Sequence, residues 1–169
     1  MVKMKTLRLS ERQRKALRRS VAHWERIVKC VSDRRFASVY AACTLASPYT
    51  WSDFTPVYLA HAFFSRASKE VSGREEGMSS SCCPLCALYA GSSGDSYASR
   101  CSSCPVSLVS GAKCCRSTPF IPVMEALQGL YAAALKKGAS EEETEGSRVS
   151  LEEAASCELS FLRGILEEY

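Results

Sequence analysis

The chain has 169 residues, of which 46% are hydrophobic and 24% are charged, so its composition excludes wholesale disorder and a fibrous repeat. The mean hydropathy of −0.10 and the lack of an apolar run of membrane-spanning length lead us to expect no membrane association. Ten cysteines against two histidines are the one compositional extreme, and they point to metal or disulfide chemistry.

The net charge of +4 is distributed unevenly along the chain, with a basic N-terminal part and an acidic C-terminal part. Residues 1–35 carry 12 Lys or Arg against 3 Asp or Glu, whereas residues 139–169 carry 2 against 9. We expect the two charged ends to be solvated faces that attract one another. Residues 1–20 lack the apolar core of a signal peptide, so a cytoplasmic localisation is expected, in the host cell if the protein is viral. In such a reducing compartment, closely spaced cysteines are metal ligands more often than disulfides.

An N-terminal helical part is predicted over residues 1–70, and it begins with a basic helix over 10–31. Ser10 and Gln13 have the spacing of a capping box, which starts the helix. Apolar residues at helical spacing form one stripe for the core, namely Leu17, Val21, Trp24, Val28 and Val31. The opposite face carries three basic residues that could contact the phosphates of a nucleic acid, namely Arg12, Lys15 and Arg19.

An aromatic insert over about residues 33–70 completes this part. A second helix is predicted within 34–46, and a third runs from Thr55-Pro56, which suit the N-cap and the first helical position, to Lys69. The aromatic residues of the insert either pack its own core or anchor a protein partner, because aromatic side chains are favoured anchors at interfaces. The partner-binding candidates are Trp51, Phe54 and Tyr58.

Three further parts follow: an exposed linker, a Cys-rich zinc module and the C-terminal helices, at residues 71–81, 82–120 and 121–169. Ser and Gly in the module favour short turns and small hairpins. One C-terminal helix is predicted from Pro122 to Gly138, and the last one from a capping box at Ser150. An acidic linker over 139–149 separates them.

Two CxxC pairs mark the Cys-rich module, and they are Cys83 with Cys86 and Cys101 with Cys104. Two such turns can complete a tetrahedron of thiolates around Zn²⁺. Four thiolates leave no open coordination position, so the zinc would be structural. Cys114 and Cys115 stay in reserve, because either could replace one member of the pairs. Without a metal, the cysteines would be buried thiols or, in an oxidising setting, disulfides. The cysteines within helical patterns are expected to be small core residues, namely Cys30, Cys43 and Cys157.

Four motifs resemble a pattern found in small cysteine-rich proteins of unassigned function from tailed bacteriophages and prophages. They are His23-Trp24-Glu25, Cys83-Pro84-Leu85-Cys86, Cys101-Ser102-Ser103-Cys104-Pro105 and Cys115-Arg116-Ser117-Thr118-Pro119-Phe120. The resemblance covers about half of the chain, and the aromatic insert departs from it. It implies a viral origin, a bound metal and a role for Cys115, but no activity.

Enzymatic activity and catalytic residues are not expected. His23, Glu25 and the first CxxC superficially reproduce the H-x-E and C-x-x-C of zinc deaminases. Against this, no proline precedes Cys83, and His23 falls in mid-helix beside Trp24. Only His23 and His61 could serve a hydrolase triad, and no serine lies in a G-x-S-x-G elbow.

We therefore expect a mainly α fold, with amphipathic helices packed around a small zinc-ribbon-like module that holds structural Zn²⁺. The expected function is that of a phage accessory protein that binds a host protein, with a component of bacterial defence as a candidate target. The alternative is a nucleic-acid-binding zinc protein that uses the basic helix. The sequence determines neither the target nor the oligomeric state.

Overall fold

The computed structural model describes residues 8–46, 55–78, 83–89, 101, 104–111, 115, 118–136 and 140–169. The helices in these ranges are α1 (Glu11–Val31), α2 (Phe36–Leu45), α3 (Pro56–Ser72), α4 (Pro84–Tyr89), α6 (Pro105–Ser110), α7 (Phe120–Leu135) and α8 (Glu141–Glu168). The expected mainly α fold is confirmed. The described part of the Cys-rich module consists of short helical segments without a strand, so the expected hairpins of a ribbon are not seen there.

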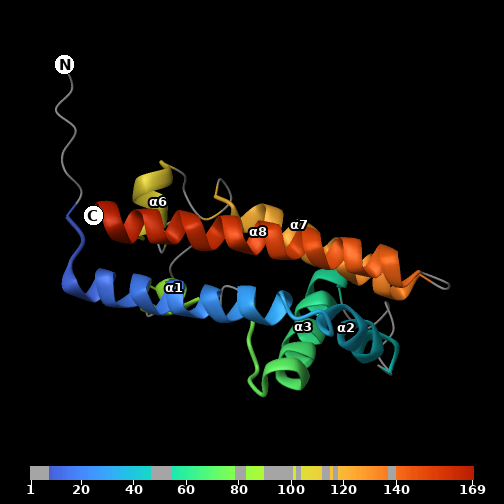
Figure 1. Ribbon diagram of the computed structural model, residues 1–169. Coiled ribbons are helices and arrows are strands. Elements are labelled where there is room, and N and C mark those ends of the chain that lie inside the picture. Colours follow the sequence, from blue (N-terminus) through green and yellow to red (C-terminus); the bar gives the residue numbers. More distant parts are fainter. Residues whose placement is uncertain are drawn as a thin grey trace.

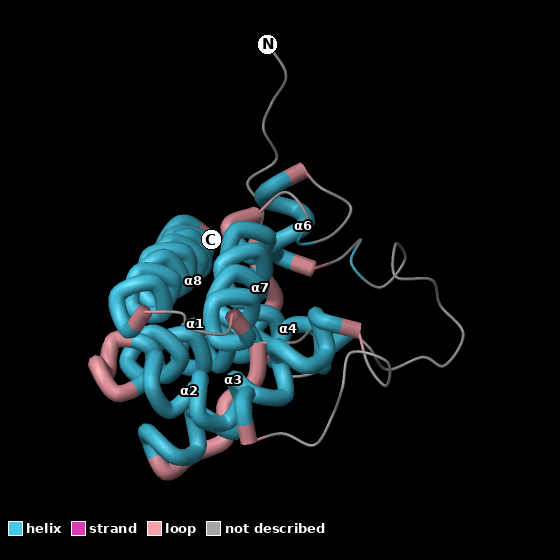
Figure 2. Tube along the Cα trace, turned by 90° about the vertical axis from the view of Figure 1, so that its right-hand side faces the viewer, coloured by secondary structure: helices cyan, strands magenta, loops and turns pink. Residues whose placement is uncertain are grey.

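Helix α8 packs along both α1 and α7, and in Figure 1 it lies above α1 and in front of α7. It runs in the direction opposite to α1, so the start of α1 lies near the end of α8. Helices α2 and α3 pack against each other and cover the end of this bundle where α1 ends and α8 begins (Figure 2). Helix α4 packs on α1 and α6 packs on α8. None of the helices in the described ranges is long and apolar enough to cross a membrane.

Helix α1 begins as the sequence predicts. The backbone N–H of Gln13 donates to Ser10 Oγ at 3.2 Å, and the backbone N–H of Ser10 donates to Gln13 Oε1 at 2.8 Å. This reciprocal pair satisfies two of the N–H groups that a helix leaves unpaired at its start. The predicted stripe faces the core, where Leu17 and Val31 are fully buried.

The acidic segment over 139–149 is not a linker, because α8 begins at Glu141. The cap is Ser140, which forms a capping box with Glu143, while the box predicted at Ser150 lies inside the helix. Glutamates in the first turn favour the positive end of the helix dipole. Further along, Arg148 is buried, and its guanidinium donates to the Val31 carbonyl at 2.6 Å, the last carbonyl of α1. The segment therefore extends the helix that packs on α1.

Within the segment predicted as an exposed linker over 71–81, residues 72–75 are exposed as expected, but residues 76–78 are packed inward. Helix α3 continues to Ser72, and Gly73 ends it with φ of 74°, a conformation that favours glycine. Glu76 and Met78 beyond it are buried. The composition indicated a solvated segment, but ion pairs to α1 hold Glu76 inside.

The described aromatic residues of the insert mostly build its core. Phe36 packs against Phe64 with ring centroids 5.4 Å apart, and Phe63 stacks on Tyr131 of α7 at 5.9 Å. The buried Tyr40 hydroxyl donates to the Ala60 carbonyl at 3.2 Å, which ties α2 to α3. Packing of the insert, one of the two alternatives, therefore accounts for these rings.

The three cysteines expected in the core differ in their surroundings. Cys30 is buried, and Cys43 is partly buried against the core. Cys157 is exposed, so the expectation for it was wrong. Its position on α8 falls just beside the buried stripe, which runs through Ala155 and Glu158.

Candidate functional site

Two of the predicted ligands sit at the starts of short helices. Cys83 directly precedes α4 and Cys104 is the N-cap of α6. In both cases proline occupies the first helical position, where its missing N–H is not needed and its fixed φ suits the helix. The motif Cys-Pro thus places a thiol where the first free N–H groups of a helix point.

Backbone N–H groups face both of these thiols. Those of Leu85 and Cys86 face Cys83, and those of Val106 and Ser107 face Cys104. Such groups stabilise a thiolate, which accepts hydrogen bonds and carries the charge that a metal needs. Burial acts in the opposite direction and leaves the pKa of the Cys104 thiol raised. A cation bound between the thiols would offset that cost.

The thiols of three cysteines form a chain of contacts that the CxxC spacing alone does not give. Cys86 contacts Cys115 and also Cys83. The contact with Cys115, followed by burial and the other thiols, raises the pKa of Cys86 to about 12, while the contact with Cys83 acts to lower it. Cys104 is buried and close enough to interact electrostatically with Cys83, Cys86 and Cys101.

Cys101 lies one turn before Cys104, because the N–H of Cys104 donates to the Cys101 carbonyl at 3.0 Å. The predicted quartet and the reserve Cys115 therefore share one neighbourhood. Cys114 lies outside the described residues. Although the thiols are neighbours, the described part of the chain holds no group of three or more His, Cys, Asp and Glu side chains arranged to hold a metal ion. The thiols converge as a cluster and do not form a coordination tetrahedron.

Helices α1 and α8 complete the walls around this cluster with polar side chains. Ser20 of α1 is fully buried, and its Oγ lies 4.0 Å from Cys83 Sγ. Glu158 of α8 is buried, and its Oε2 has no hydrogen-bond partner among the described residues. Burial first, and then the neighbouring Cys83, raises the pKa of the Glu158 carboxyl to about 7. Sequence reasoning missed Glu158, although it stands at helical spacing between Ala155 and Leu162 in an apolar stripe.

His23 is held by the segment after α3. Its Nδ1 lies 3.1 Å from Glu76 Oε2, and its Nε2 lies 2.8 Å from the Gly77 carbonyl oxygen. Arg26 Nε donates to the other carboxylate oxygen of Glu76 at 2.6 Å. Both ring nitrogens of His23 are engaged, so in this conformation neither is available as the third ligand that a deaminase-like centre requires.

Glu25, the other residue of that motif, points to α8, where Arg163 donates to it at 2.7 Å. The buried group around Glu76 was also missed by the sequence reasoning. Its only sequence signal is a pair of glutamates within a segment otherwise typical of a linker, and that signal does not tell which glutamate turns inward.

The basic residues predicted to bind nucleic acid lie on one exposed face of α1. Arg12, Lys15 and Arg19 are exposed and form no ion pair with a carboxylate in the described ranges. The antiparallel packing places the acidic start of α8 at the opposite end of the bundle from them (Figure 1). An ion pair joins the middle of α1 to α8, Glu25 with Arg163, and near the start of α1 Arg14 donates to the carbonyl oxygen of Tyr169 at the end of α8.

Of the three partner-binding candidates, Trp51 and Phe54 lie outside the described residues. Tyr58 is 58% exposed at the start of α3. Two other apolar side chains are exposed nearby in the chain, Leu45 at the end of α2 with 70% and Val57 beside Tyr58 with 42%.

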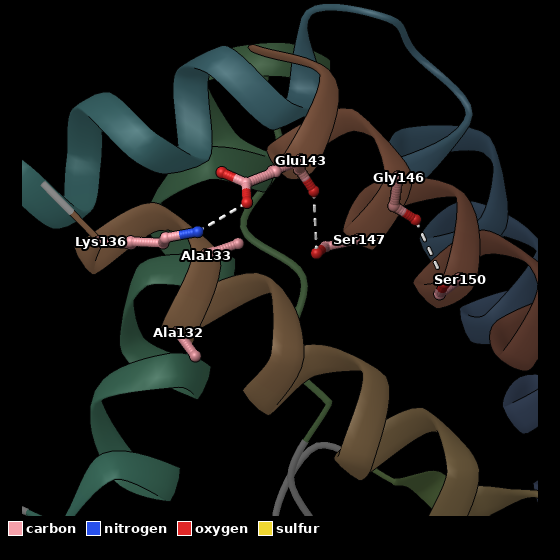
Figure 3. A pocket seen from close by; sticks show the side chains of 7 residues that line it. All are labelled: Ala132, Ala133, Lys136, Glu143, Gly146, Ser147 and Ser150. Atoms are coloured by element: carbon pink, nitrogen blue, oxygen red, sulfur yellow. Dashed lines mark hydrogen bonds and ion pairs between the residues drawn. The ribbon is translucent and has the colours of Figure 1, made fainter. Parts of the chain in front are cut away.

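A pocket of about 470 Å³ lies between α7 and α8 (Figure 3). Its lining is of mostly small side chains, namely Ala132, Ala133, Lys136, Glu143, Gly146, Ser147 and Ser150. Lys136 and Glu143 pair across it at 2.6 Å, and the serine hydroxyls donate to carbonyls of their own helix. Because its polar groups satisfy one another, we assign no ligand to this pocket.

No protein-family model, curated protein or solved structure matches this chain.

Proposed function

We propose that the protein is a zinc-stabilised, non-enzymatic accessory protein of a bacteriophage or prophage that acts by binding a host protein. A component of bacterial defence is a candidate target. The viral origin rests on the resemblance of the motifs around His23, Cys83, Cys104 and Cys115. Two of these motifs touch in the fold, since the Phe120 ring of the last motif packs on Trp24 of the first.

The observation that supports the metal is that Cys83, Cys86, Cys101, Cys104 and Cys115 share one neighbourhood, with Ser20 of α1 and Glu158 of α8 beside Cys83. Soft thiolate ligands select zinc over the hard cations that oxygen ligands favour. A metal held by four thiolates has no position left for water, so its contribution is folding free energy. The short helices α4 and α6 are too brief to be stable alone, and such segments gain most from a metal.

The observation that supports a protein partner is the exposure of three apolar side chains at the end of α2 and the start of α3. Leu45, Val57 and Tyr58 flank residues 47–54, which include Trp51 and Phe54. Aromatic residues supply most of the binding free energy at protein interfaces.

Nucleic-acid binding is the second candidate, and the exposed cations of α1 favour it. Arg12, Lys15 and Arg19 lie on one helix face, and no described carboxylate neutralises them. A phosphate backbone bound to them would release counterions, so such binding weakens steeply as salt rises.

The deciding experiment is a pull-down from bacterial lysate with the full-length chain. Protein capture predicts a host protein that survives nuclease treatment and high salt, and that is lost with Trp51→Ala and Tyr58→Ser. Val149→Ser, at an exposed apolar position of α8, is the matched control and should retain it. Recovery of nucleic acid alone, lost with salt and in the triple variant Arg12→Ala, Lys15→Ala, Arg19→Ala, would reject protein capture in favour of the second candidate.

A further inference from the structure

Both ring nitrogens of the buried His23 face oxygen atoms of the segment after α3. Nε2 lies 2.8 Å from the carbonyl oxygen of Gly77, and Nδ1 lies 3.1 Å from Oε2 of Glu76. A carbonyl oxygen and an ionised carboxylate can only accept a hydrogen bond, and a neutral imidazole carries one proton. In a neutral ring, one of the two contacts would therefore bring a lone pair of nitrogen against a lone pair of oxygen. Either the ring carries a second proton or the Glu76 carboxyl does.

The surroundings of Glu76 decide between these two positions of the proton. Its other oxygen, Oε1, accepts from Arg26 Nε at 2.6 Å and lies 3.4 Å from Arg74 Nε. Guanidinium groups stay charged, and two of them beside a buried carboxyl favour its ionised form. The second proton therefore belongs on the ring of His23, and the Glu76 carboxylate is surrounded by three cations.

The other groups around this pair do not change the balance. From α3, the Ser68 hydroxyl accepts from the Glu76 N–H at 2.8 Å and adds no charge. From α1, the Cys30 thiol is close enough to interact electrostatically with Glu76. Burial first, and then Asp33 and Glu76, raises the pKa of Cys30 to about 11, so the thiol stays neutral. The ring of His23 is thus the group of this site whose charge changes near neutral pH.

We propose that His23 is an imidazolium when residues 76–78 are docked on α1, and that loss of its second proton at higher pH releases this segment. The charged ring donates to both Glu76 and Gly77, whereas a neutral ring can donate to only one of them. Because the proton stabilises the docked segment, docking is favoured at low pH and weakens as pH rises. Met78, which is buried, would leave the core with the segment. The attachment to α1 of the chain between α3 and α4 is thereby pH-dependent.

The first test observes the ring protons in the unmodified chain. The protein has two histidines, so ¹⁵N-labelled histidine gives two ring systems, and long-range ¹H–¹⁵N NMR distinguishes an imidazolium from a neutral ring. His61 is the internal control, because its buried Nδ1 has no hydrogen-bond partner in the described ranges and burial lowers its pKa. At about pH 6.5, the ordinary midpoint of a histidine, we expect an imidazolium at His23 and a neutral ring at His61. A neutral ring at His23 at this pH overturns the proposal.

Two glutamate variants test the cause of the charge. Glu76→Gln should leave His23 neutral at the same pH, because no carboxylate remains to hold the second proton. Glu75→Gln, at the exposed neighbouring position, is the matched control and should keep the imidazolium. An imidazolium that persists in Glu76→Gln would show that Glu76 does not hold the proton.

The second test follows the segment by hydrogen exchange in Glu158→Gln, which removes the other carboxyl whose protonation is expected to change with pH. The Glu76 amide reports docking, because it donates to Ser68 Oγ. Its protection factor should fall about tenfold or more between about pH 6 and about pH 8, as one charge-assisted hydrogen bond is lost. The amide of Ile27, a fully buried residue of α1, should keep its protection. Equal protection of the Glu76 amide at the two pH values would rule out release of the segment.

Discussion

The Phe120 ring meets the Trp24 ring edge to face, at an interplanar angle of 87° and with the centroids 6.3 Å apart. This contact joins the middle of α1 to the first residue of α7. One turn earlier on α1, Ser20 faces Cys83, so the same helix also forms a wall of the thiol cluster. Helix α1 therefore contacts the thiol cluster at Cys83 through Ser20 and the start of α7 at Phe120 through Trp24.

Phe120→Ala should lower the free energy of unfolding by about 2 kcal/mol, because a half-buried ring and its contact with Trp24 are lost. Chemical denaturation followed by circular dichroism measures the change. Leu108→Ala, at an exposed site on α6, is the control and should stay within about 0.5 kcal/mol of the wild type. Equal effects of the two substitutions would show that the aromatic pair contributes nothing.

Arg148→Ala should be among the more damaging substitutions outside the apolar core, with a loss of about 3 kcal/mol. The buried guanidinium satisfies the last carbonyl of α1 and pairs with Glu145 and Glu152. Removing it leaves that carbonyl and Glu145 without this donor, while Glu152 keeps its hydrogen bond from Ser32. Arg163→Ala breaks the exposed pair with Glu25 and should cost less than about 1 kcal/mol in the same denaturation series. If Arg148→Ala lowers the free energy of unfolding no more than Arg163→Ala does, the bond of Arg148 to the Val31 carbonyl does not stabilise the end of α1.

Glu76→Gln should destabilise the protein by about 2 kcal/mol, because His23 and Arg26 lose the buried charge that both of them face. Glu75→Gln at the neighbouring exposed position is the matched control, and only its hydrogen bond from Ser65 is affected. The two melting temperatures should therefore differ by several degrees. If they coincide, the segment after α3 is not held by Glu76.

Glu158 makes stability depend on pH. Its pKa is raised from 4.5 to about 7 by burial in the folded protein, so the folded state keeps a proton that the unfolded state has already released. Stability therefore falls as pH rises from about 4.5 to about 7 and then stays lower, by roughly 3 kcal/mol. Glu158→Gln should remove this loss and be more stable than the wild type at about pH 8.

The measurement for Glu158 is urea denaturation of wild type and Glu158→Gln across this pH range. Glu153→Gln, at an exposed position of the same helix, controls for the loss of one negative charge from α8. A constant difference between wild type and Glu158→Gln over the whole range would show that Glu158 does not titrate differently in the folded protein.

The sequence predicts the long helices well where local chemistry decides them. The capping box at Ser10 and the apolar stripe through Trp24 are local patterns, and α1 follows them closely. The segment over 73–78 differs from the prediction because a single buried charge decides it, whereas the start of α8 was missed although the capping box of Ser140 and Glu143 is a local pattern. Neither Glu76 nor Arg148 shows in its own segment that a partner in α1, distant in sequence, will hold it inside.

The same distinction applies to the candidate metal centre. CxxC spacing predicts that Cys83 and Cys86 lie together, because both belong to one turn of four consecutive residues. The contact of Cys86 with Cys115 depends instead on how α7 docks against Trp24. Such a tertiary contact is not encoded in spacing, which leaves both Cys114 and Cys115 as reserve ligands, and only the resemblance to phage proteins singles out Cys115.

The most direct test of the account is the zinc content of the purified full-length chain, measured by elemental analysis after extensive dialysis. We expect about one zinc per chain, together with a large fall in melting temperature when a chelator removes it. A folded, cooperatively melting protein that contains no zinc, and whose melting temperature a chelator leaves unchanged, would contradict it.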